Sequence, residues 1–169
     1  MTVRIRSATA EDAPDVARLC WAYRDLLLTR SSEFPDMVEF YYGADSYAAL
    51  INDLPRIHAR PKGDILLATV DSKVIGCAMY YPFEIKGVTE IKRVFVDQTA
   101  RGTGAGSALL RATMQAAQTD GYTRVVLDTV TTLTEAITLY GRVGFQPCAP
   151  DYETNPDFMP HLRFFDHAL

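Results

Sequence analysis

The stretch Arg101-Gly102-Thr103-Gly104-Ala105-Gly106 lies between an apolar segment that ends at Phe95-Val96 and a helical segment that begins near Gly104. Its three glycines occupy alternate positions, and glycine lacks the side chain that would keep backbone N–H groups away from a ligand. The first N–H groups of a helix have no helical partners, and the helix dipole favours an anion there. The stretch therefore predicts a phosphate site, to which Arg101 adds a permanent cation.

The loop departs from two other phosphate-binding patterns. A P-loop ends in Gly-Lys-Ser/Thr, whereas this chain has Gly106-Ser107-Ala108. A dinucleotide fingerprint is GxGxxG, whereas this loop is GxGxG. Both patterns are weakened by these differences. Taken alone, the loop also remains compatible with a tight strand-to-helix turn.

Composition limits the classes of protein to consider. The chain has 169 residues and 48% hydrophobic residues, enough for one domain over residues 1–169 with a well-buried core. The formal net charge is -4 and no basic run is apparent, which argues against nucleic acid and anionic membranes as partners. Residues 1–7 are polar and the apolar runs are short, so we predict neither a signal peptide nor a membrane span, and a cytoplasmic protein.

Cysteines and histidines are scattered along the chain. The three cysteines form no CxxC pair, and the three histidines have no metal-ligand spacing on one helix. We therefore predict reduced thiols and no metal.

Hydrophobic periodicity and turn residues predict the elements around the loop. Strands are expected over 3–7, 64–70, 73–83, 90–97, 124–129, 145–148 and 162–165. Helices are expected behind an N-cap at Thr9, and over 47–59, 104–119 and 134–143, with a loop at 31–35. This order predicts an α/β fold, a mixed sheet with helices on both faces.

Several segments together resemble the GNAT superfamily of acyl-CoA-dependent N-acetyltransferases. The loop matches that family as Arg101-x-x-Gly104-x-Gly106, and the segment 90–96 resembles its central strand. The helix that carries Tyr140 and leads to Gly144-Phe145 resembles a later family helix, and Val74-Ile75-Gly76 resembles its hairpin. The match covers nearly the whole chain in the family's order. It implies a mostly antiparallel central sheet in which the central strand pair splays apart.

The resemblance also implies acetyl-CoA as a cosubstrate, without a metal. The backbone N–H groups expected to hold its pyrophosphate belong to Arg101, Gly102, Thr103, Gly104, Ala105, Gly106 and Ser107. Main-chain groups of Val94 and Val96 would pair with the pantetheine arm in the splayed slot. Leu133 stands where many relatives have asparagine, and whether Thr131, Thr132 or Thr134 replaces that contact is left open.

Two residues are the catalytic candidates that the resemblance implies. Tyr140 would give a proton to the departing thiolate; the alternative is a core aromatic residue. Glu90 would be the base that deprotonates the amine. The alternative for Glu90 is an exposed side chain paired with Lys92 or Lys86, and Asp128 is the reserve base.

The acceptor is expected to contact residues 29–60 and the C-terminal stretch. Aromatic residues suit a cationic amine, although each is equally compatible with core packing; they are Phe34, Tyr41, Tyr42, Tyr47, Tyr80 and Tyr81. A polar loop over 151–155 is a candidate to close over the substrate.

Two functions of different classes follow. The first is an enzyme that moves an acetyl group from acetyl-CoA to a primary amine of a small molecule or peptide. For the oligomeric state, the resemblance implies a homodimer. The second is a non-catalytic acyl-CoA-binding or sensing domain with the same fold. The loop spacing argues against a third reading, a nicotinamide-dependent oxidoreductase.

Overall fold

The computed structural model describes residues 2–169. The strands in this part of the chain are β1 (Arg4–Ser7), β2 (Asp64–Val70), β3 (Lys73–Pro82), β4 (Val88–Val96), β5 (Arg124–Val130), β6 (Gln146–Pro147) and β7 (Leu162–Ala168). The α-helices are α1 (Ala13–Arg30), α2 (Pro35–Tyr42), α3 (Ala44–Ile57), α4 (Ala105–Thr119) and α5 (Thr134–Val143).

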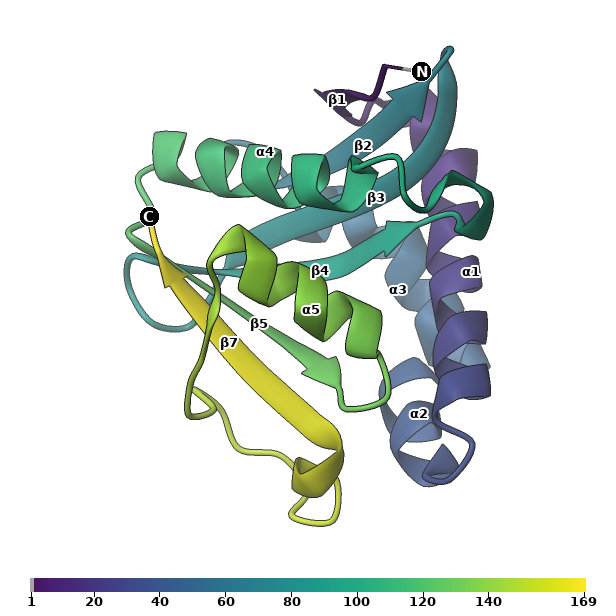
Figure 1. Ribbon diagram of the computed structural model, residues 1–169, viewed down its shortest axis with the longest axis vertical. Helices are drawn as coiled ribbons and strands as arrows, with labels where there is room; N and C mark the ends of the chain where they lie inside the picture. The colour runs from purple at the N-terminus through teal and green to yellow at the C-terminus, as the bar shows by residue number, and fades with distance from the viewer. Residues whose placement is uncertain (1) are drawn as a thin grey trace.

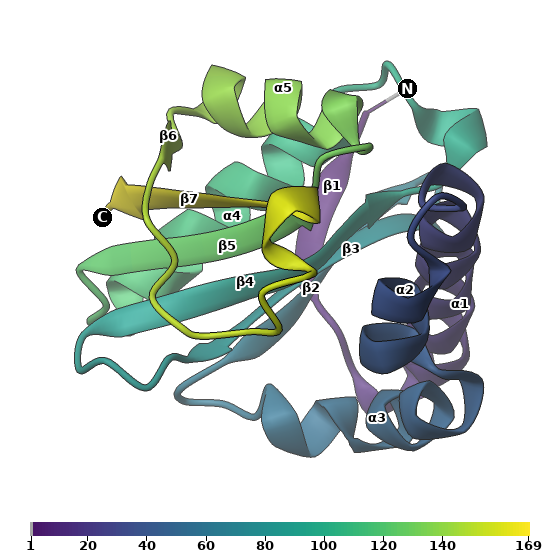
Figure 2. The ribbon, with the colours of Figure 1, turned by 90° about the horizontal axis from the view of Figure 1, so that it is seen from below.

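These strands form one sheet in the order β1-β2-β3-β4-β5-β7-β6. Neighbouring strands are antiparallel except β4 and β5, which are parallel. Figures 1 and 2 show α4 and α5 on one face of the sheet and α1, α2 and α3 on the other. The predicted mixed α/β fold with helices on both faces is confirmed.

The two central strands pair over only a short length. Val88–Glu90 of β4 faces Arg124–Val126 of β5, and beyond these residues the strands diverge (Figure 1). A β-bulge follows on β4, where Arg93 has φ of +53° and the register with β3 shifts. The predicted splay of the central pair is therefore present, and it opens a slot between β4 and β5.

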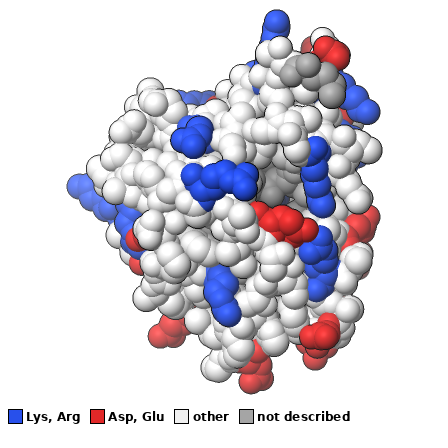
Figure 3. Space-filling model, in the orientation of Figure 1, with Lys and Arg blue, Asp and Glu red and all other residues white. Residues whose placement is uncertain are grey.

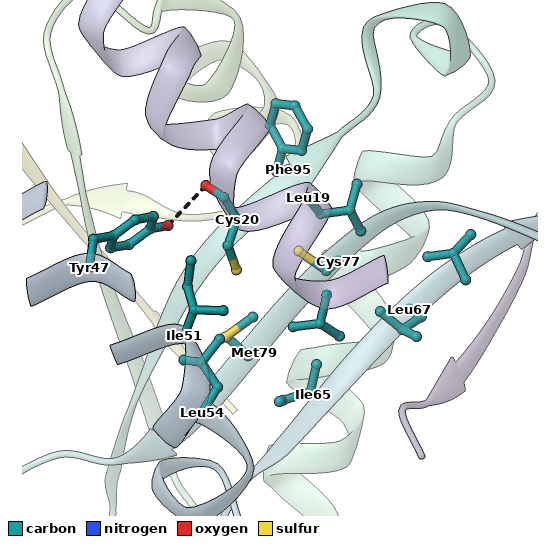
Figure 4. Packing of buried hydrophobic residues seen from close by; sticks show 12 residues of the cluster. Leu19, Cys20, Tyr47, Ile51, Leu54, Ile65, Leu67, Cys77, Met79 and Phe95 are labelled. Carbon is teal, nitrogen blue, oxygen red and sulfur yellow. Dashed lines mark hydrogen bonds between the residues drawn. The ribbon is translucent and has the colours of Figure 1, made fainter. Parts of the chain in front are cut away.

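A buried cluster fixes α1 and α3 against the sheet. Figure 4 shows Leu19 and Cys20 of α1 and Leu54 of α3 among apolar side chains of β2 and β3. The hydroxyl of Tyr47 donates to the carbonyl of Cys20 at 3.1 Å, which satisfies the polar end of a buried ring. This packing holds α1 beside the slot.

The segment between α1 and β2 differs from its prediction. The loop predicted over 31–35 is present up to residue 34, α2 then occupies residues for which no element was predicted, and α3 begins and ends earlier than the predicted 47–59. Pro35 stands in the first turn of α2, where its missing N–H costs no hydrogen bond. Only Met37 and Val38 are buried on α2, too few to reveal helical periodicity.

Two further observations concern partners and chemistry. No helix within residues 2–169 is long and apolar enough to cross a membrane. In the same residues, no group of three or more His, Cys, Asp or Glu side chains is arranged to hold a metal ion. Cys20, Cys77 and Cys148 are all free thiols.

Candidate functional site

A first cavity, of about 440 Å³, lies between α4 and α5 beside the diverging part of β4; we call it the donor cavity. Eight of the nine residues predicted to bind the cofactor line it: Val94, Val96, Arg101, Gly102, Gly104, Ala105, Gly106 and Ser107. The ninth, Thr103, donates its hydroxyl to the carbonyl of Ala100 at 2.7 Å. The fold thus brings the predicted set together, while its contacts with a cofactor stay a prediction.

The glycine loop has a conformation that depends on glycine. Gly102 and Gly104 have φ of +81° and +83°, a region in which L side chains are strained. A Cβ at either position would meet no atom within 4 Å, so the backbone conformation, and not lack of space, requires glycine. Gly104 is the N-cap of α4, whose first N–H groups have no helical partners. This local geometry is that of an anion site.

Basic side chains surround the donor cavity. Arg30, Arg101 and Arg142 line it, and Arg30 forms an ion pair with Glu135 that joins α1 to α5. Figure 3 shows basic and acidic side chains around a hollow near the middle of this face. Guanidinium groups form strong hydrogen bonds with phosphate oxygens, so this rim suits a phosphorylated ligand.

Leu133 is buried and lines the donor cavity. The three neighbouring threonines, considered above as substitutes for the family asparagine, are not among the lining residues. The hydroxyl of Thr132 lies instead 3.4 Å from that of Ser31. The cavity wall is therefore apolar at this point.

A second cavity, of about 350 Å³, lies on the other side of the diverging strands, beside α2; we call it the acceptor cavity. Figure 2 shows α2 and the segment between β6 and β7 at this end of the sheet. Polar and aromatic groups in its lining include Tyr23, Tyr41, Tyr42, Tyr81, Glu90, Lys92, Asp128 and Tyr152. Tyr23 of α1 lines both cavities, so the two meet at its side chain.

Two carboxylates in the acceptor cavity share one ammonium group. The Nζ of Lys92 lies 2.8 Å from Glu90 Oε1 and 3.2 Å from Asp128 Oδ1. Tyr81 donates its hydroxyl to Glu90 at 2.6 Å, and Tyr152 donates to Asp128. Burial lowers the pKa of Lys92, but Asp128 and Glu90 outweigh it and hold that pKa well above its ordinary value. Lys92 therefore stays charged between the two carboxyl groups.

Glu90 agrees only in part with its non-catalytic alternative. It pairs with Lys92, as that alternative predicts. It is, however, 5% exposed and lines the acceptor cavity, so it is not the exposed side chain that the alternative describes. Asp128, the reserve base, lines the same cavity.

Tyr140 is buried, and its ring packs against Phe145 and Phe165 with centroid distances of 6.0 and 5.8 Å. Burial raises the pKa of its hydroxyl, and the nearby charges of Asp128 and Tyr42 raise it further. The phenol is therefore protonated at neutral pH. Tyr140 belongs to a buried core cluster and lines neither the donor cavity nor the acceptor cavity.

Of the six aromatic candidates, Phe34 lines neither cavity and stacks on His161 with ring centroids 4.2 Å apart. The other five divide into two groups. Tyr41, Tyr42 and Tyr81 line the acceptor cavity. Tyr47 and Tyr80 are fully buried in the core, as the packing alternative predicts.

Sequence reasoning missed several residues of the acceptor cavity, among them Tyr23 and Lys92. Tyr23 has helical spacing with other apolar residues of α1 and resembles a core residue in the sequence. Lys92 is two positions after Glu90, so both side chains share a strand face. That spacing is the signal by which Lys92 could have been found.

Comparison with known proteins identifies the class that this fold and site define. Residues 24–145 match the model of the Acetyltransferase (GNAT) family, which is more than half of the chain. The chain belongs to this family of acyl-CoA-dependent acetyltransferases.

Individual relatives carry compatible names. An uncharacterized N-acetyltransferase of Schizosaccharomyces pombe is 35% identical over 102 residues, 60% of this chain and 62% of that protein, so the match spans under two-thirds of the relative. The IAA acetyltransferase of Azospirillum brasilense is 33% identical over 130 residues, 76% of this chain and 84% of that protein. The PaiA N-acetyltransferase of Thermoplasma acidophilum, solved with coenzyme A, superimposes with a TM-score of 0.70 at 18% identity and 100% coverage of both chains.

Proposed function

We propose that the protein moves an acetyl group from acetyl-CoA directly to a primary amine of a small molecule or peptide. The observation that carries this proposal is the meeting of the donor and acceptor cavities at Tyr23, where β4 leaves β5. One cavity contains an anion site at a helix start, and the other contains two carboxylates. Such a two-sided site suits a reaction in which donor and acceptor are bound together.

The residues of the donor cavity fit acetyl-CoA, which supplies an activated thioester carbonyl when it is bound. The N–H groups from Arg101 to Ser107 would hold its pyrophosphate. The N–H of Asp97 donates to Ile75 of β3 at 2.8 Å. Because main-chain groups alternate in direction along an antiparallel ladder, those of Val96 point to the unpaired edge of β4. Val94 points the same way, so both are open to amide groups of the pantetheine arm.

The acceptor amine must lose a proton before it can attack. A free alkyl amine has a pKa of ~10.4, as lysine does, so it arrives as an ammonium ion. In this proposal Glu90 takes the proton as general base, and Asp128 is the alternative because Lys92 holds both carboxylates. The new C–N bond then forms at the carbonyl carbon.

Tyr140 is proposed as the general acid. Its raised pKa keeps the phenol protonated, so a proton is available as the C–S bond breaks. The proton passes to the departing sulfur, and the products are an amide and a free thiol.

Thiol release from acetyl-CoA with a panel of primary amines tests the function. We expect saturable, amine-dependent release and an N-acetyl product of matching mass. Calorimetric titration with acetyl-CoA runs in parallel. Saturable binding without turnover on any amine would contradict the enzyme and support the non-catalytic acyl-CoA sensor.

A further inference from the structure

The lining of the acceptor cavity selects among amines, and this inference rests on the proposed N-acetyltransferase function. We propose that the acceptor is a small primary amine with one ammonium group on an aromatic or branched aliphatic body and no carboxylate. Three features of the cavity carry the proposal: its joined walls and small volume, its charge and its aromatic lining.

The two walls of the acceptor cavity are joined to each other. The hydroxyl of Tyr41 on α2 hydrogen-bonds that of Thr154 in the segment between β6 and β7. In the same segment Phe158 packs on Phe40 and Tyr41, with ring centroids 5.5 and 5.9 Å apart. These contacts tie α2 to the opposite wall, so the acceptor enters an open-mouthed cavity whose two walls are joined. A cavity of about 350 Å³ suits a small molecule.

The charge of the cavity disfavours a carboxylate on the acceptor. Lys92 is the one basic residue among those that line it, and both Glu90 and Asp128 already engage its ammonium group. Glu84, an exposed residue of the lining, adds a further negative charge. An ammonium ion is attracted to this set. A carboxylate beside that ammonium would meet like charges and find no unengaged cation.

The rest of the lining favours an apolar body next to the ammonium group. Five tyrosines contribute to it: Tyr23, Tyr41, Tyr42, Tyr81 and Tyr152. Met37, Val38 and Phe83 complete an apolar surface. Aromatic faces attract a desolvated ammonium ion, and the apolar side chains would bury an aromatic ring or a branched chain.

Matched pairs of acceptors that differ only in a carboxylate test the proposal on the full chain. The pairs are phenethylamine with phenylalanine, tryptamine with tryptophan, and isopentylamine with leucine, together with a short peptide amine. We expect kcat/KM from thiol release to be about 10²-fold higher or more for each decarboxylated member, because like charges in contact cost several kcal/mol. A value for the amino acids or the peptide that equals or exceeds that of the amines would overturn the substrate class while leaving the acetyltransferase function intact. Acetyl-CoA binding without turnover on any acceptor would overturn both.

A charge variant at the exposed turn gives a second test. Glu84→Arg adds a cation to the lining, so it should reduce the preference for the decarboxylated amine about tenfold. Glu39→Arg is the matched control, since Glu39 is exposed on α2 outside the lining and undergoes the same change of charge. We expect the control to keep the wild-type preference. An equal effect of both variants, or none at Glu84, would contradict the role of local charge.

Discussion

Glu90 and Asp128 line the acceptor cavity, Tyr140 lies in the core, and the surroundings of each group suit a different task. Burial keeps the phenol of Tyr140 protonated, which suits an acid. Glu90 and Asp128 each accept hydrogen bonds from Lys92 and from a tyrosine, which suits groups that act as anions. Proton donor and proton acceptor are thus separated by environment, and single substitutions can test each one.

Removal of the Tyr140 hydroxyl tests the acid. Tyr140→Phe keeps the ring packed against Phe145 and Phe165, so we expect kcat to fall about 10²- to 10⁴-fold with an unchanged Kd for acetyl-CoA. Tyr122→Phe is the control, because the Tyr122 hydroxyl donates to the carbonyl of Lys62 at 2.6 Å and Tyr122 lines neither cavity. Steady-state kinetics and calorimetry measure the two quantities. Full turnover in Tyr140→Phe would exclude the role.

The base is tested by its pH profile. Glu90→Gln keeps the shape of the side chain but cannot take a proton, so kcat/KM should fall and the acidic limb that reports ionisation of the base should disappear. Asp128→Asn is measured in parallel. If the limb survives in Glu90→Gln and disappears in Asp128→Asn, Asp128 is the base and the assignment of Glu90 is wrong.

Among the elements, the glycine loop before α4 could be predicted from local sequence, and the helix α2 could not. The loop could be predicted because its glycines are needed by the backbone itself, as φ at Gly102 and Gly104 shows. α2 could not, because its tyrosines look the same whether they face a cavity or a core. Neighbours from other elements, including Thr154 and Phe158, decide which side of α2 meets the cavity.

The conformation of the loop gives a prediction for Gly104. Gly104→Ala forces a Cβ into a left-handed backbone at a cost of about 1–2 kcal/mol, so the Kd for acetyl-CoA should rise about tenfold. Gly141→Ala on α5 is the matched control, since a Cβ there meets no atom within 4 Å and its φ is not positive. Calorimetry should show an unchanged Kd for the control. Equal affinities of both variants would mean that the loop does not hold the cofactor.

Across the whole molecule, the packing of distant segments against one another determines the parts of the site that local sequence patterns do not predict. Alternation of apolar residues and turn signals predicted the strands, and the family resemblance predicted the splay that β4 and β5 show beyond Glu90 and Val126. Tyr23 was missed because its place in the site depends on how α1 packs over the splay, whereas Lys92 could have been found from its two-residue spacing to Glu90. Eight of the nine predicted cofactor residues line one cavity. They do so because they belong to the end of β4, to the loop that follows it in the sequence and to the start of α4.

The stability of the molecule should depend on pH through His58. Its Nδ1 donates to the carbonyl of Tyr80 at 2.9 Å, and Nε2 has no hydrogen-bond partner among the described residues. Burial, with the nearby charge of Arg93, lowers the pKa of His58 to about 4 from 6.5. Between pH 6.5 and about 4, the unfolded chain therefore binds a proton at this histidine more readily than the folded protein does. The free energy of unfolding should fall by about 3 kcal/mol as pH drops through this range.

Urea unfolding at pH 7.5 and at pH 4.5 measures this contribution. In His58→Gln the group no longer titrates, so the loss of stability between the two pH values should be smaller than in the wild type. The same loss in both proteins would contradict the role of His58.

The most direct measurement for the central claim is a crystal structure of the protein with acetyl-CoA. The account predicts pyrophosphate oxygens within hydrogen-bond distance of N–H groups between Gly102 and Ser107. It also predicts the thioester sulfur beside the Tyr140 hydroxyl, with the acetyl group directed into the acceptor cavity. A pyrophosphate bound away from this loop, or an acetyl group directed away from Glu90 and Asp128, would contradict it.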